Sequence, residues 1–119
     1  MKKTRIAEFI LMILAALAVR IELPPGSTVS LSDDTGESWT QTGENDCSLL
    51  SARSKWNASL KRQGWILKNE FSPIKSTDQY FSVWQRKKSR IILMLWRIDS
   101  GKSGFSWGDY SAANKEAKP

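Results

Sequence analysis

The residues of this sequence best suited to binding chemistry are basic side chains in two short stretches, one of them close to Trp84. Lysine and arginine interleaved with aromatic rings typically bind polyanions, because the charges meet phosphate or sulfate while a ring stacks on a base or sugar. We therefore take Trp84 as the aromatic candidate. The basic candidates are Arg86, Lys87, Lys88, Arg90, Lys55, Lys61 and Arg62.

The sequence lacks the residues on which the commonest catalytic and metal-binding sites depend. The chain has no histidine and one cysteine, Cys47, which excludes histidine-based triads and zinc sites and also an intramolecular disulfide. We expect Cys47 to be a small half-buried residue. We predict no enzyme activity, no catalytic or metal-binding residues and no cofactor.

One stretch resembles part of a phosphate-binding loop but lacks an essential residue. Residues 100–103 read Ser-Gly-Lys-Ser, and the full motif requires a glycine five positions before Gly101, where this chain has Trp96. A glycine turn between two strands is the simpler interpretation.

The N-terminus has the layout of a secretory signal peptide. Lys2, Lys3 and Arg5 precede an apolar run from Phe9 to Val19, and small residues stand at 16 and 18. As a helix this run would span only about 16 Å, short of the ~30 Å hydrocarbon core of a bilayer. We predict a signal peptide over residues 1–18 and export to the periplasm or the outside of the cell. An uncleaved membrane anchor through residues 6–23 is the alternative.

Charge divides the remaining chain into blocks. Residues 21–46 hold six acidic residues and no basic one, whereas residues 47–102 hold twelve basic and three acidic residues. The first block is rich in Ser, Thr, Gly and Pro, which is typical of a linker. We therefore predict a flexible acidic arm over residues 19–45, a small domain over 46–111 and a disordered tail over 112–119.

Hydrophobic periodicity within this small domain predicts an α+β fold. Apolar residues recur at helical spacing over 48–63, and four strand-like stretches follow at 65–71, 79–86, 90–99 and 104–110. Short turns between strands favour hairpins. We predict one amphipathic helix on a four-stranded antiparallel meander sheet, in the order α-β-β-β-β.

The stretch 90–99 is apolar on both faces, which predicts a central strand. Because one helix covers only one face of a sheet, the second face should meet the acidic arm, a partner or a second copy of the chain. The predicted core residues are Trp56, Trp65, Trp84, Trp96, Phe81, Ile66, Leu67 and Leu93.

These features predict a small exported, non-enzymatic binding or structural protein of the cell envelope or extracellular space. Its basic and aromatic face would bind a protein or an anionic envelope polymer or lipid, with nucleic acid disfavoured, and its second sheet face is a candidate for self-association. In a second hypothesis the acidic arm covers the basic face until a ligand displaces it. A third hypothesis is a membrane-anchored domain of unknown role, and a fourth, if the N-terminus is not a signal, is a cytosolic nucleic-acid-binding module.

Overall fold

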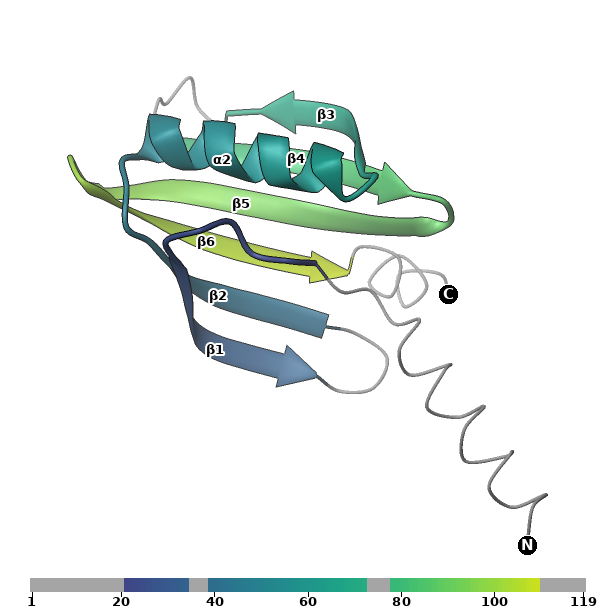
Figure 1. Ribbon diagram of the computed structural model, residues 1–119, viewed down its shortest axis with the longest axis horizontal. Helices are drawn as coiled ribbons and strands as arrows, with labels where there is room; N and C mark the ends of the chain where they lie inside the picture. Colours follow the sequence, from purple (N-terminus) through teal and green to yellow (C-terminus); the bar gives the residue numbers. More distant parts are fainter. Residues whose placement is uncertain (1–20, 35–38, 73–77, 110–119) are drawn as a thin grey trace, which may run out of the picture.

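The computed structural model describes residues 21–34, 39–72 and 78–109, which form one helix and one antiparallel sheet (Figure 1). The signal peptide predicted over 1–18 and the tail predicted over 112–119 lie outside these residues. In chain order the elements are β1 (Ser27–Asp34), β2 (Trp39–Asn45), α2 (Leu49–Arg62), β3 (Ile66–Phe71), β4 (Gln79–Arg86), β5 (Ser89–Asp99) and β6 (Lys102–Asp109).

The sheet has six strands in the order β1-β2-β6-β5-β4-β3, so the prediction of a four-stranded sheet is wrong. The helix and the four strands expected after residue 46 lie close to their predicted positions. The two additional strands come from the stretch interpreted as a flexible acidic arm. They pair with each other, and β2 pairs with the last strand, β6.

The inward residues of β2 explain why its sequence does not resemble a strand. Gln41, Gly43 and Asn45 lie opposite Trp107, Phe105 and Ser103 of β6. The Trp107 indole N–H donates to Gln41 Oε1 at 3.0 Å. Polar and small residues therefore occupy positions where a half-buried strand usually shows apolar alternation.

Both ends of α2 are fixed by local signals. The Ser48 side chain accepts a hydrogen bond from the Ser51 N–H at 3.3 Å and caps the first turn. Gly64, just past the other end, has φ +93°, a conformation that favours glycine. Trp65 N–H and Gly64 N–H donate to the carbonyls of Leu60 and Lys61, which closes the helix in a Schellman motif.

The core lies between α2 and one face of the sheet. Trp56 and Leu60 of the helix are fully buried, as are Trp84 and Leu93 of the strands, and the Trp56 and Phe105 rings lie 4.9 Å apart. The segment before β1 completes this layer, since Ile21 and Leu23 pack against the core and the segment passes in front of β6 in Figure 1. No helix within the described residues is long and apolar enough to span a membrane.

Candidate functional site

The β4–β5 hairpin presents two lysines at its tip. Arg86 pairs with Ser89 across the hairpin, which leaves Lys87 and Lys88 as the turn residues, both exposed. Lys87 has φ 55°, in the left-handed region. Because this conformation costs a residue with a Cβ atom roughly 1–2 kcal/mol, glycine would fit the position better than lysine.

Arg86 holds the hairpin against the end of the helix. Its guanidinium lies 4.5 Å from the centre of the Trp65 ring, and its Nη1 donates to the Gln63 carbonyl at 3.2 Å. A cation is favourable here because the last carbonyls of a helix carry partial negative charge. Arg86 is half-buried and is therefore a structural residue as well as a charged one.

The hairpin and the end of α2 thus lie at the same end of the molecule, on the right in Figure 1. Lys61 and Arg62 form the last turn of the helix, and both are exposed. Lys55 is also exposed but lies about two helical turns before Arg62. We call the cluster the basic end. It comprises Lys61, Arg62, Arg86, Lys87, Lys88 and Arg90.

Two acidic residues of the described chain lie near the basic end. Asp109 is in register with Ile91, next to Arg90. Glu22 is exposed, and its backbone N–H and carbonyl both bond to the Gln63 side chain at 2.9 Å. Because the cluster contains six basic residues and these two acidic residues lie near it, its net charge is positive.

Within the sheet, the strands of the acidic stretch are separated from the β4–β5 hairpin by β6. β1 and β2 form one edge of the sheet, whereas β3 and β4 form the other. Asp33 of β1 is in register with Ile92 of β5 through Thr40 and Gly108, so it lies at the same strand ends as Arg90 but three strands away from β5. Because pairing with β6 fixes this hairpin in place, the self-covering hypothesis receives no support from the described strands.

Trp84 is not at the surface. Its side chain is fully buried, and its indole N–H donates to Ser82 Oγ at 2.8 Å. It faces α2 because Trp84 and Ile91 form a cross-strand pair on the inner face of the sheet. Trp84 therefore belongs to the core and cannot stack on a ligand.

The prediction that Ile66 belongs to the core is wrong, because its side chain lies at the surface beside the basic end. Ile66 is the first residue of β3, and its side chain is 64% exposed. Trp65 takes the buried position, with 2% exposure. Adjacent residues of an extended chain point to opposite sides, so only one of the two can enter the core.

A bidentate ion pair joins the helix to the edge strand. Arg53 of α2 binds Glu70 of β3 through two hydrogen bonds, from Nε at 3.0 Å and from Nη2, and its guanidinium lies 4.6 Å from the Tyr80 ring centre. The hydrogen bonds from Arg53 hold the pKa of Glu70 below its ordinary value. The same bonds raise the pKa of Arg53. This arrangement stabilises one orientation of the helix.

A buried polar network centres on Asn45. Its Oδ1 accepts hydrogen bonds from Trp56 Nε1 and Ser27 Oγ, both at 2.8 Å. Its Nδ2 donates to Ser103 Oγ at 3.1 Å, and Ser103 donates to the Cys47 carbonyl at 3.0 Å. Each hydrogen bond of Asn45 connects β2 to a different element, so the network has a structural role. Cys47 is half-buried, as predicted.

The end opposite the basic end has a hollow of about 340 Å³ beside the start of α2. Its lining mixes both charge signs. Asp78 and Arg97 form an exposed ion pair at 3.8 Å, and Asp99 Oδ1 accepts from the Gly101 N–H at 2.9 Å. The Ser-Gly-Lys-Ser stretch at 100–103 thus forms part of the β5–β6 turn. No group of three or more possible metal ligands occurs within the described residues.

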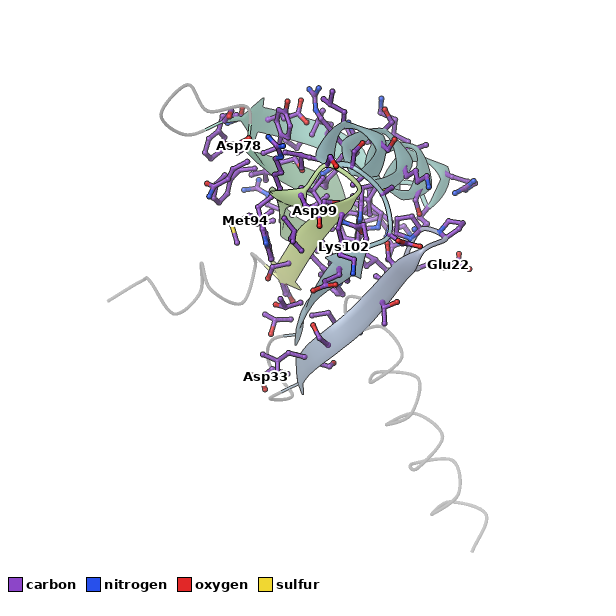
Figure 2. The ribbon with its side chains drawn as sticks, turned by 90° about the vertical axis from the view of Figure 1, so that its left-hand side faces the viewer. Glu22, Asp33, Asp78, Met94, Asp99 and Lys102 are labelled. Carbon is purple, nitrogen blue, oxygen red and sulfur yellow. The ribbon has the colours of Figure 1, made fainter. Side chains whose placement is uncertain are left out.

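The sheet face opposite the helix is apolar and half-exposed. Met94 points away from the helix in Figure 2, and Trp96 covers Gly104, where an added Cβ would clash with the indole ring. Phe71 and Phe81 stack at the β3 edge with ring centres 5.3 Å apart. Trp96 and Phe81, predicted in the core, lie on this second face. Its apolar residues are Phe71, Phe81, Val83, Ile92, Met94 and Trp96.

Comparison of the chain with models of protein families, with curated proteins and with solved structures finds no significant match.

Proposed function

We propose that this chain is a small exported, non-enzymatic protein that binds an anionic partner through its basic end. The observation that supports this proposal is the position of two basic stretches that are distant in the sequence. The fold brings the last turn of α2 and the β4–β5 hairpin together, with Gln63 bonded to Arg86 between them. Clustered cations raise the local concentration of a polyanion and strengthen its binding at low salt.

The conformation of Lys87 also favours a binding role. Strained residues that persist in a fold are often found at functional positions, and here the strain places an ammonium group at the hairpin tip. A glycine would relieve the strain but would remove the charge.

The packing of residues 21–23 favours a signal peptide over an anchor. Ile21 and Leu23 pack against the core, and Glu22 bonds to Gln63, so these residues are not available to a membrane span over 6–23. The remaining stretch from Ile6 to Arg20 would reach about 22 Å as a helix, which is short of the ~30 Å hydrocarbon core. Export in turn disfavours nucleic acid as the natural partner.

The proposal is tested by the salt concentration at which the protein elutes from immobilised heparin, used as a model polyanion. We expect the double variant Lys87→Gln/Lys88→Gln to elute at clearly lower salt than the wild type. The matched control is Arg97→Gln/Lys102→Gln, which removes the same charge at the opposite end of the molecule. If both variants shift equally, binding reflects net charge alone and the proposal is wrong.

A third variant, Lys87→Gly, separates the effect of losing the charge from any effect of losing stability. Lys87→Gly should relieve the left-handed strain and raise the free energy of unfolding by about 1 kcal/mol. It should nevertheless elute from heparin at lower salt than the wild type. Unchanged elution of this more stable variant would exclude Lys87 from the binding surface.

A further inference from the structure

We infer that the anionic partner is the headgroup surface of a lipid bilayer, and that Ile66 inserts into it. This inference rests on the proposed function, because the basic end must first bind anions. It adds the kind of surface that is bound and an apolar residue that enters it.

Ile66 lies in the same row of the sheet as Gln85 and Arg90, next to the β4–β5 hairpin of the basic end. It follows Gly64 and Trp65 at the end of α2, and it pairs in register with Gln85, the residue before Arg86. Its side chain is 64% exposed. The turn lysines follow Arg86 directly, so an exposed aliphatic side chain lies beside the most strongly charged hairpin of the described chain.

Cations beside an exposed aliphatic residue favour a bilayer over a soluble polymer. A hydrophilic polyanion gives an isoleucine side chain no apolar surroundings, so Ile66 would not contribute to binding it. At a bilayer the lysines and arginines meet anionic headgroups while an apolar side chain enters the boundary with the acyl chains. Both kinds of residue at the basic end then contribute.

The inference is tested with the protein as purified from the producing cells, its N-terminus determined by intact mass. Binding is measured by co-sedimentation with vesicles of phosphatidylcholine plus phosphatidylglycerol and with vesicles of phosphatidylcholine alone. We expect binding to the anionic vesicles only. Ile66→Ser should weaken it roughly fivefold to tenfold, which corresponds to loss of one partly inserted aliphatic side chain. Ile66→Trp should strengthen it, because tryptophan favours the membrane interface.

The matched control is Ile98→Ser, which changes the same residue type at 44% exposure on the opposite end of the molecule. It should leave vesicle binding unchanged. Equal binding of all three Ile66 forms would overturn the inference, as would equal weakening by Ile66→Ser and Ile98→Ser.

Heparin elution keeps this result separate from the proposed function. Ile66→Ser should elute from heparin with the wild type, because it removes no charge. If the turn lysines control heparin elution but the protein does not bind anionic vesicles, the proposed function holds and the bilayer inference fails. If the turn lysines do not affect heparin elution, the proposed function fails and the inference fails with it.

Discussion

Asn45 shows how a single polar residue fixes the position of several elements. Its side chain is 2% exposed, and it bonds to Ser27, Trp56 and Ser103 at once. Buried polar groups are costly when their partners are removed, because they have already lost water. The network therefore joins β1, β2, β6 and α2 in one arrangement.

Replacement of Asn45 by alanine should destabilise the protein substantially. The Trp56 indole N–H would lose its acceptor, and the Ser27 and Ser103 hydroxyls would lose a partner. We expect the free energy of unfolding to fall by about 2–4 kcal/mol in chemical denaturation. The control is Asn69→Ala on β3, where the side chain is exposed and the loss should stay within about 0.5 kcal/mol. Similar losses in the two variants would show that the Asn45 network does not stabilise the fold.

At the residue scale, the sequence predicts which residues are basic better than it predicts whether a side chain points into the core or to the surface. Residue type alone predicts exposed basic side chains at Lys61, Arg62, Lys87 and Lys88, and all four are exposed. The burial of Trp84 and the exposure of Ile66 do not follow from it. They depend on which residue of each strand faces α2, which is set by pairing between strands and by the irregular register between Leu67 and Asn69.

At the scale of elements, the Arg53–Glu70 pair sets how the helix lies on the sheet. The Glu70 side chain is 18% exposed and the Arg53 side chain 38% exposed. Solvent therefore screens the pair in part, and we expect a contribution to stability of about 1 kcal/mol or less. Two hydrogen bonds and the contact with Tyr80 still favour a single geometry.

This pair should make stability depend on pH in the acidic range. Because folding lowers the pKa of Glu70, its contribution is fully present above the pKa of the unfolded chain and is lost as the pH falls through the folded pKa. At neutral pH, Glu70→Gln should be less stable than the wild type by about 1 kcal/mol or less. The difference should shrink as the pH falls below about 4, measured by urea denaturation across the acidic range.

Glu44→Gln is the control for this prediction. Glu44 and Lys102 form an exposed pair at 3.8 Å, with 55% and 48% exposed side chains. Glu44→Gln should change the free energy of unfolding by no more than about 0.5 kcal/mol at neutral pH. A pH-independent difference between wild type and Glu70→Gln would mean that the Glu70 carboxylate does not provide the stabilisation.

The elements after residue 46 could be predicted because their signals are local. Helical spacing, a serine N-cap and Gly64 define α2, and alternation separated by turns defines the four following strands. β2 lacks such signals because its inward positions hold glutamine, glycine and asparagine, and β1 lies in a stretch rich in serine and threonine. Their stability comes from long-range pairing with β6 and from the Asn45 network, which the local sequence does not reveal.

At the scale of the whole molecule, the charge blocks of the sequence become a separation in space. The chain carries a net charge of +6. The acidic residues of β1 and β2 lie in two strands at one edge of the sheet, while the basic end lies on the other side of β6, where α2 meets the β4–β5 hairpin (Figure 1). A molecule with this asymmetry approaches an anionic surface in a preferred orientation.

The most direct test of the central claim is a lysine footprint in the presence of heparin fragments. The protein is acetylated with and without the polyanion, and the modification of each lysine is measured by mass spectrometry. We predict protection of Lys61, Lys87 and Lys88 that is lost at high salt, with no change at Lys102 at the opposite end. Protection spread evenly over all lysines, or centred on Lys102, would contradict the account.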